Sequence, residues 1–474
     1  MKKIILFLIT IIVITIAFQN KVYAKTASFY EAEYIQDIWN FKKMPSGLIH
    51  YNQARIFRNT ETNEIAYCTE PFTYFKSGST YLGTKTPPNF TDEQIENLKL
   101  ATHFGYGYKN HEDIKWYAIT QHLIWQITNP EGTYFFQKHA TGSTRFTFDN
   151  EISEIKNLME NYKKETSIKN KTYNILVGEK LIISDENNIL STFQTNSPIA
   201  KIENNQLIID TKKEGNYKIT LTKEDKLYNK QSIFYQLDNN QDLMDIGDPT
   251  PITNEININI IKTELTINKL DHDTNNNIPE GDSSLTGAIF ELYKDNDLYK
   301  TISLDKPNIK IENIPLGKYY IKEIKAGNGY NINNNKYQFD ITYEKPNHNI
   351  NITNKVIKGK LKIKKLYGIN NNFKPEKNIS FNIYNSKDNL IKTIITNEKG
   401  IAEITLPYGK YKLTQLTTTE GYQKITPIQF EIVNDSEIFY ELKDYKIPVP
   451  NTSTLNKYKK LWSIICEKLQ SLFL

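Results

Sequence analysis

Two side chains in this sequence, a thiol and a carboxamide, are suited to react with each other. Cys68 lies in AYCTEPF (residues 66–72), Gln121 lies in AITQHLIWQIT (residues 118–128), and the other of the two cysteines is Cys466. A thiolate is a good nucleophile and leaving group, and a carboxamide offers an acyl carbon. The pair therefore suggests an internal thioester, formed with loss of ammonia.

The segment that contains Gln121 has the pattern of a buried helix. Residues 113–130 start with an aspartate suited to an N-cap and end in an Asn–Pro pair that stops a helix. Apolar residues surround Gln121 along this segment: Trp116, Ala118, Ile119, Leu123, Trp125 and Ile127. We expect Gln121 to be buried with them, and a buried carboxamide needs hydrogen-bond partners. Cys68 ends an expected strand over residues 63–68, where a side chain can be directed into a site.

Two other interpretations of these residues stay open. In the first, Gln121 hydrogen-bonds to nearby backbone and Cys68 packs as a small apolar residue. In the second, Cys68 is the nucleophile of a hydrolase or transpeptidase, with His103, His111 or His122 as its base. No segment around these histidines matches a local signature of a cysteine protease.

The first 24 residues have the pattern of a secretory signal peptide. Lys2 and Lys3 precede an apolar run over residues 5–18, and residues 22–24 fit a cleavage site. The apolar run is shorter than the roughly 20 residues that span a bilayer as a helix. We therefore predict an exported chain that starts near Lys25.

The charge and the cysteine content limit the class of protein. Removing Lys2, Lys3 and Lys21 with the signal peptide lowers the formal net charge from +5 to +2. So small an excess of positive charge does not favour binding of a polyanion, so we expect no nucleic-acid partner. We also expect no cofactor and no metal site. An exported chain without a disulfide framework fits a Gram-positive bacterium better than a eukaryote.

The remaining sequence divides into zones of different composition. Residues 25–165 are rich in aromatic residues and mix helical and strand patterns, whereas residues 166–262 show the short alternating segments of a small accessory β domain. Residues 263–356 and 357–447 are two copies of one pattern, and residues 448–474 form a tail. We expect a multidomain chain, with an α+β domain followed by all-β domains.

The repeat is visible in blocks that keep the same order. LTINKLD (265–271) aligns with LKIKKLY (361–367), and LGKYYIKEIKAGNGY (316–330) aligns with YGKYKLTQLTTTEGY (408–422). Alternating strands bounded by glycine and asparagine turns predict a β-sandwich for each copy.

The motifs of the first zone occur in a recognisable order. Tyr67 and Cys68 end a strand, FGYGY follows at residues 104–108, and TQHLIW follows at residues 120–125. In order and spacing this set resembles the thioester domain of Gram-positive surface adhesins, over residues 28–165. The resemblance implies an α+β fold for this zone.

The resemblance also implies a chemistry and a partner. The Cys68 thiol would attack the Gln121 carboxamide, and Tyr67 and Trp125 would wall an aromatic, water-poor pocket that shields the bond. A lysine amine of a protein on a host or neighbouring cell would then displace Cys68 and form an amide. Such a protein is a single-use reagent at the bacterial surface, not a turnover enzyme. A structural, pilin-like stalk protein that binds non-covalently is the alternative.

Each copy of the repeat opens with a strand that carries a lysine among apolar residues. In the first copy Lys269 is followed by Glu323 in YYIKEIK and by Asn354 in NITNK. This pattern resembles the collagen-adhesin B-type (Cna-B-like) domains of pilins. It implies an isopeptide bond from Lys269 to Asn354 with Glu323 as proton relay, because burial favours a neutral amine beside a protonated carboxyl. A solvated lysine with an ordinary salt bridge is the simpler alternative.

The second copy departs from this pattern. Lys365 aligns with Lys269, but Gln415 stands at the position of the acid, and the terminal acceptor is Asp444. A glutamine cannot carry a proton between the amine and the acyl group. We therefore expect no proton relay in this copy, and at most an ion pair between Lys365 and Asp444.

The tail contains a motif similar to a sorting signal. VPNTS (449–453) resembles the LPxTG-type signal, with Val449 for leucine and Ser453 for glycine. The segment LWSIICEKLQSLFL (461–474) is interrupted by charged residues and is too short to span a bilayer. Sortase as a partner, an interfacial amphipathic helix and a degenerate signal all stay open, and with them attachment to the wall or the membrane.

Overall fold

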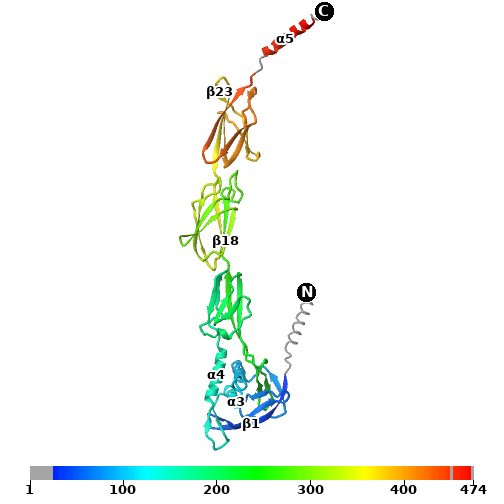
Figure 1. The fold of residues 1–474 in the computed structure, drawn as a ribbon, viewed down its shortest axis with the longest axis vertical. Coiled ribbons are helices and arrows are strands. Elements are labelled where there is room, and N and C mark those ends of the chain that lie inside the picture. Colours follow the sequence, from blue (N-terminus) through cyan, green and yellow to red (C-terminus); the bar gives the residue numbers. More distant parts are fainter. Residues whose placement is uncertain (1–24, 449–451, 471–474) are drawn as a thin grey trace, which may run out of the picture. The chain divides into compact units, whose positions relative to one another are not determined.

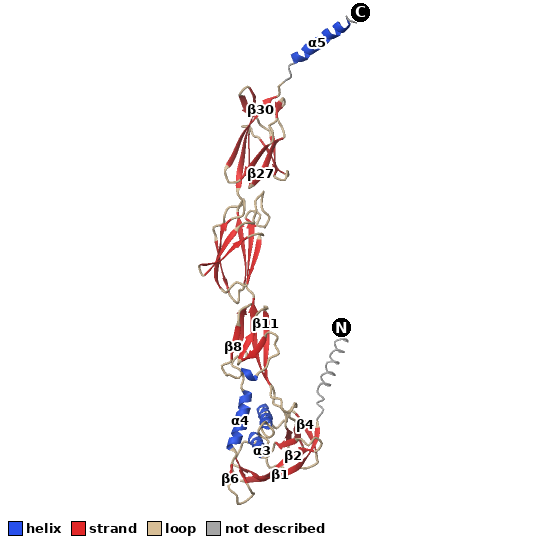
Figure 2. Ribbon diagram, in the orientation of Figure 1, coloured by secondary structure: helices blue, strands red, loops and turns tan. Residues whose placement is uncertain are grey.

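The computed structural model describes residues 25–448 and 452–470 (Figure 1). The expected signal peptide, residues 1–24, lies outside the described residues, as do the first three residues of the VPNTS motif. The chain divides between Ile260 and Ile261 into two compact units, which are described separately. Figure 2 shows that strands dominate, and that the helices belong to the N-terminal unit and to the C-terminal segment.

The N-terminal unit is built around an antiparallel sheet that closes on itself. The strands pair in the order β1, β2, β3, β13, β12 and β4, and β4 pairs again with β1. β5 and β6 extend the sheet from the distal part of β1. The strands are β1 (Thr26–Lys43), β2 (Ile49–Asn59), β3 (Ile65–Cys68), β4 (Thr80–Thr84), β5 (Thr133–Gln137), β6 (Arg145–Phe146), β12 (Phe234–Gln236) and β13 (Leu243–Asp245).

The helices of this unit share one apolar core with the sheet. They are α2 (Asp92–Phe104), α3 (Lys115–Thr128) and α4 (Asp149–Lys163). A capping box between Thr91 and Gln94 starts α2. Every residue of α3 from Trp116 to Trp125 is buried, as the apolar residues around Gln121 predict. Gln121 therefore lies inside the core.

A small β domain with its own apolar core is inserted into this unit. Its sheets have the orders β8–β10–β9 and β11–β14–β7. The elements are β7 (Thr172–Leu176), β8 (Leu181–Ser184), η1 (Leu190–Thr192), β9 (Ala200–Glu203), β10 (Gln206–Ile209), β11 (Gly215–Lys223) and β14 (Ile252–Ile261). Between β11 and β14 the chain returns to the first sheet, where β12 pairs with β4 and β13 with β3. The expected boundary at residue 165 thus differs from the structure, because residues 234–245 complete the sheet of the first domain.

The C-terminal unit contains two sandwich domains built on the predicted repeat. The first consists of sheets β18–β15–β21 and β17–β16–β19–β20. Its strands are β15 (Glu264–Asp271), β16 (Ile289–Lys294), β17 (Asp297–Ser303), β18 (Asn308–Glu312), β19 (Gly317–Lys325), β20 (Lys336–Ile341) and β21 (Asn347–Asn354). The first strand, β15, and the last, β21, are parallel neighbours.

The second sandwich repeats this arrangement. Its sheets are β23–β22–β30–β28, with β26 also paired to β22, and β25–β24–β27–β29. Its strands are β22 (Lys358–Ile369), β23 (Asn372–Pro375), β24 (Ser380–Asn385), β25 (Leu390–Ile395), β26 (Ile401–Pro407), β27 (Gly409–Gln415), β28 (Tyr422–Gln423), β29 (Ile428–Ile432) and β30 (Glu437–Lys446). The parallel pairing of first and last strand, β22 with β30, recurs here. In both domains this pairing places the lysine of the first strand near the expected acceptor in the last.

The C-terminal segment forms α5 (Thr452–Gln470), which begins inside the VPNTS motif. Several of its apolar side chains are exposed, Leu461, Trp462 and Ile465 among them. Within the described residues, no helix combines the length and the apolarity that crossing a bilayer requires.

Candidate functional site

Strand β3 and helix α3 bring Cys68 and Gln121 into direct contact. The backbone N–H of Cys68 donates to Oε1 of Gln121 over 2.8 Å, and Nε2 of Gln121 donates to the carbonyl oxygen of Cys68 over 2.7 Å. The two residues are only 2 % and 4 % exposed. The carboxamide is therefore held in one orientation by the peptide groups of Cys68.

These hydrogen bonds place useful groups at both ends of the carboxamide. If Sγ attacks the acyl carbon, negative charge develops on Oε1, where the N–H of Cys68 can stabilise it as an oxyanion-hole donor does. The nitrogen that would leave as ammonia is oriented by a carbonyl oxygen. The arrangement can thus support acyl transfer from Gln121 to the thiol.

The FGYGY segment packs against α3 at Thr120, one residue before Gln121. Gly105 lies so close to Thr120 that a Cβ built on Gly105 would be 2.1 Å from Oγ1 of Thr120. Oγ1 of Thr120 accepts a hydrogen bond from the N–H of Tyr106 and donates one to the carbonyl oxygen of Trp116. The glycine therefore permits a close approach that holds the residue preceding Gln121.

A small cavity adjoins the pair. Its volume of about 10 Å³ is near the lower limit for a single water molecule. The lining includes aromatic side chains (Phe57, Tyr117 and Trp125) and carboxamides (Asn40, Asn52 and Gln241). Burial raises the pKa of the Cys68 thiol well above its usual value, against a smaller lowering by Arg55. The thiol is therefore protonated at neutral pH.

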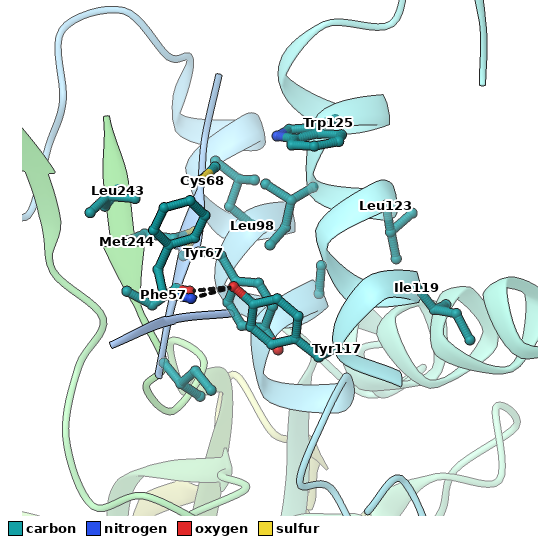
Figure 3. Packing of buried hydrophobic residues seen from close by; sticks show 14 of the residues in the cluster. Phe57, Tyr67, Cys68, Leu98, Tyr117, Ile119, Leu123, Trp125, Leu243 and Met244 are labelled. Atoms are coloured by element: carbon teal, nitrogen blue, oxygen red, sulfur yellow. Dashed lines mark hydrogen bonds between the residues drawn. The ribbon is translucent and has the colours of Figure 1, made fainter. Parts of the chain in front are cut away.

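The aromatic walls differ in part from the expectation. Trp125 lines the cavity, but Tyr67 does not. Neighbouring residues of a strand point to opposite faces, so Tyr67 packs away from Cys68 and stacks on Tyr117, with ring centroids 4.7 Å apart (Figure 3). Tyr117 lines the cavity at the position expected for Tyr67. Phe72 packs 5.4 Å from Trp125 and has a φ of +64°, which is rare for a bulky residue.

No histidine within residues 25–448 is among the residues that line the cavity. His103 faces two aspartates elsewhere, and His111 binds backbone carbonyl groups at the end of α2. His122 stacks on Phe136 with ring centroids 4.2 Å apart, and burial lowers its pKa to about 3. The geometry therefore offers no imidazole base to Cys68.

Four carboxamides that line the cavity, Asn40, Asn52, Gln53 and Gln241, were not predicted from the sequence. Asn40 and Asn52 are opposite each other in the pairing of β1 with β2, and Gln241 lies in the loop between β12 and β13. Nε2 of Gln241 donates to the carbonyl oxygen of Glu70 over 2.6 Å. None of them belongs to a local motif, because the sheet pairings alone bring them to Cys68.

In the first sandwich, Lys269, Glu323 and Asn354 form a buried cluster. Nζ of Lys269 donates to Oδ1 of Asn354 and lies 3.0 Å from one carboxylate oxygen of Glu323. The other carboxylate oxygen accepts from Nδ2 of Asn354 over 2.8 Å. Desolvation lowers the pKa of Lys269, and Glu323 opposes part of that shift. The expected amine, acid and carboxamide are thus in mutual contact.

In the second sandwich, Lys365 contacts two carboxylates. Its Nζ pairs with Asp444 and lies 3.3 Å from Oε2 of Glu376, the residue that follows β23. Lys365 is 0 % exposed and Glu376 1 %. Gln415 donates from Nε2 to Asp444 over 2.5 Å. Glu376, which follows β23, thus places a buried acid beside Lys365 that the alignment of the two copies did not predict.

Comparison with known proteins identifies the domains. Residues 65–176 match the family model of the thioester domain, and residues 263–356 and 359–446 each match the SpaA prealbumin-like fold domain. No curated protein matches the chain.

Several solved structures are similar to parts of the chain. The Bacillus anthracis TIE protein is 20 % identical over 89 % of this chain and 84 % of its own, with a TM-score of 0.35. The thioester domain of the Staphylococcus aureus TIE protein is 23 % identical over 50 % of this chain and 99 % of its own, with a TM-score of 0.38. The minor pilin of Streptococcus agalactiae is 17 % identical over 40 % of this chain and 98 % of its own, with a TM-score of 0.22.

The assignment rests on the family models, which fall on the domains described above. The thioester model begins at β3 and includes α2, α3 and α4, and the prealbumin-like models cover the two sandwiches. The predicted fold class, an α+β domain followed by all-β domains, is confirmed. The chain carries a thioester domain and two SpaA prealbumin-like (Cna-B-like) domains.

Proposed function

We propose that this protein is a surface adhesin that binds its target covalently, through a thioester between Cys68 and Gln121. The observation that carries the proposal is the reciprocal hydrogen bonding between the Gln121 carboxamide and the peptide groups of Cys68. The match of residues 65–176 to the thioester domain supports it.

The thioester would form by acyl transfer. Sγ of Cys68 attacks Cδ of Gln121, the Cδ–Nε2 bond breaks, and the thiol proton leaves with the nitrogen as ammonia. Because burial raises the pKa of the thiol, thiolate is scarce. The step therefore relies on proximity and on the N–H donor at Oε1, with no imidazole base. Closed aromatic surroundings then keep water from the bond.

The target would discharge the thioester. A primary amine attacks Cδ of Gln121, the C–S bond breaks, and a proton of the amine passes to Sγ of Cys68. An amide then joins the target to Gln121. Since the acyl group is consumed, each molecule reacts once, and the protein is not a turnover enzyme. We infer that the amine is a lysine of a protein on a host or neighbouring cell, and that the chain acts at the bacterial surface.

The first sandwich would be a cross-linked support. Nζ of Lys269 attacks Cγ of Asn354 and ammonia leaves, while Glu323 carries the proton from the amine to the departing nitrogen. The contacts of Glu323 with both nitrogen atoms support this sequence of events. The resulting amide ties the first strand of the domain, β15, to its last strand, β21.

The buried acid in the second sandwich changes the expectation drawn from the sequence. We infer that Lys365 and Asp444 also form an amide, with loss of water. Nζ of Lys365 attacks Cγ of Asp444, one Cγ–O bond breaks, and Glu376 carries the protons of the amine to the departing oxygen, which leaves as water. The contacts of Nζ with Asp444 and Glu376 support the bond.

Intact mass of the mature protein tests these bonds together. The wild-type mass is expected to be lower than the sequence mass by two molecules of ammonia and one of water. Cys68→Ala should restore one ammonia and abolish the adduct with methylamine, and Lys269→Ala should restore the other ammonia. The covalent function fails if wild-type Cys68 alkylates freely and the first ammonia is still present.

The alternative function, a pilin-like structural protein that binds non-covalently, predicts a different result. Such a protein would keep the mass deficits of the two sandwiches but show a free Cys68 and no adduct with amines. A hydrolase with a Cys–His pair is not supported, because no histidine of the described residues lines the cavity at Cys68.

A further inference from the structure

Carboxamides at the cavity beside Cys68 have buried polar atoms without a hydrogen-bond partner among the described residues. These atoms are Nδ2 and Oδ1 of Asn40, Oδ1 of Asn52 and Oε1 of Gln241. Asn40 is 1 % exposed and Gln241 2 %. Buried polar groups are almost always paired in folded proteins, so three unpaired carboxamides at one cavity indicate that they bind a polar molecule.

The chemistry of the lining favours a neutral amine. The unpaired oxygens are acceptors, and an amine nitrogen carries N–H donors. Within the described residues, no carboxylate or imidazole lines the cavity. The charged side chain in the lining is Arg55, which pairs with Glu31 over 2.5 Å. Because Glu31 neutralises Arg55 and the lining offers no anion to stabilise an ammonium ion, the uncharged form, which is also the nucleophilic one, is the form that fits.

We propose that Asn40, Asn52 and Gln241 form an amine-binding subsite that positions the attacking nitrogen at the acyl carbon of Gln121. The inference rests on the proposed thioester function and extends it to the residues that select the nucleophile. Their oxygens accept the N–H groups and leave the nitrogen lone pair for the acyl carbon. As the new C–N bond forms, the C–S bond breaks and the displaced proton passes to Sγ of Cys68.

The fold fixes this subsite before any target arrives. Asn40 and Asn52 are held opposite each other by the β1–β2 pairing. Nε2 of Gln241 is anchored by its hydrogen bond to the carbonyl oxygen of Glu70, and Oε1 of Gln241 has no partner among the described residues. Leu243, two residues further on, pairs with Cys68, so the loop that carries Gln241 is tied to the strand of the nucleophile.

The test compares two nucleophiles on the full mature protein. Adduct formation with methylamine and with 2-mercaptoethanol is followed by intact mass in the wild type, Asn40→Ala and Asn52→Ala. A lost hydrogen bond should slow methylamine about tenfold, whereas the thiol, which has no N–H group, should react at the wild-type rate. Gln126→Ala is the matched control, since Gln126 lies on the same helix as Gln121 but does not line the cavity. It should leave both rates unchanged.

The outcomes separate the subsite from the thioester. Equal slowing of both nucleophiles, or an unchanged methylamine rate in both variants, would overturn the subsite while the wild-type ammonia deficit upholds the thioester. A wild type without that deficit would refute the thioester and the subsite with it. Asn40→Leu keeps the size of the side chain but removes its acceptor oxygen and should slow methylamine as Asn40→Ala does; a wild-type rate in that folded variant also overturns the assignment. If Asn40→Ala does not fold, the methylamine rate of Asn52→Ala decides, because Asn52 is only half-buried.

Discussion

Replacing Glu376 with glutamine distinguishes a covalent bond between Lys365 and Asp444 from an ion pair. In the proposed chemistry the Glu376 carboxyl moves a proton from the amine to the departing oxygen, which a glutamine of the same shape cannot do. Glu376 is 1 % exposed and lies 3.3 Å from Nζ of Lys365, so bulk water cannot replace it. Loss of a positioned acid–base group slows such a step roughly 10²–10⁴-fold. We expect Glu376→Gln to leave the two side chains unlinked.

The stability lost with the bond follows from the length of chain that it encloses. A link from Lys365 to Asp444 closes a loop of about 80 residues, which by the loop-entropy relation for disulfides is worth roughly 4.5 kcal/mol at 25 °C. In a domain of this size, 1 kcal/mol shifts Tm by about 4–8 °C. The second sandwich of Glu376→Gln should therefore unfold about 20–35 °C below that of the wild type.

Intact mass and calorimetry measure these two consequences. The wild type should show the deficit of one water, and Glu376→Gln should not. Gln415→Ala is the matched control, because Gln415 also contacts Asp444 but cannot relay a proton; it should keep the deficit. Adding Gln415→Glu to Glu376→Gln puts an acid where the first sandwich has Glu323 and should restore the bond. A water deficit that persists in Glu376→Gln would refute the relay, and no deficit in the wild type would leave Lys365 and Asp444 as an ion pair.

Three further predictions concern the thioester domain. Trp125→Ala should open the cavity and speed hydrolysis of the thioester, seen as a gain of one water over time in intact mass; an unchanged half-life would contradict its shielding role. His122 has a pKa of about 3 in the folded state and about 6.5 when unfolded, so the unfolded chain binds the extra proton and stability falls as pH falls through this range. His122→Phe should therefore reduce the decrease in the free energy of unfolding between pH 7 and pH 4 by roughly 3 kcal/mol. Urea unfolding of both proteins at the two pH values measures this difference, and an equal decrease in wild type and variant would argue against it. A chain that ends at residue 165 lacks β12 and β13 and should not fold, whereas one that ends at residue 262 should; circular dichroism and thermal melting decide.

The reacting side chains could be predicted because local patterns mark them. Cys68 ends a short strand, Gln121 sits in an apolar helical segment, and Lys269 interrupts an alternating strand. The pairing of distant segments could not be predicted in the same way. β12 and β13 have only three residues each and flank a polar loop, so by themselves they resemble a linker. They are strands because β3 and β4 offer edges for pairing.

Glu376 was missed for a related reason. The alignment of the two copies places the acid at the strand position of Glu323, where the second copy has Gln415. In the structure, β23 folds back on β22 and pairs Pro375 with Leu366, which returns the next residue to Lys365. The contact depends on a short hairpin that is absent from the aligned blocks of the repeat. Alignment of the two copies therefore located the lysines but could not locate this acid.

The three sites differ in whether the chain itself provides the amine that attacks the acyl group. Each sandwich places a buried carboxyl beside its lysine, which suits formation of a stable amide. At the Cys68 cavity, neither a carboxylate nor a lysine of the described residues is in the lining. Lys42 lies two residues from Asn40 and is 2 % exposed, but its Nζ donates to Oδ1 of Asn129 over 2.6 Å. Burial lowers the pKa of Lys42 and so makes its amine more nucleophilic. Lys42 is therefore engaged with Asn129, and it is not among the residues that line the cavity.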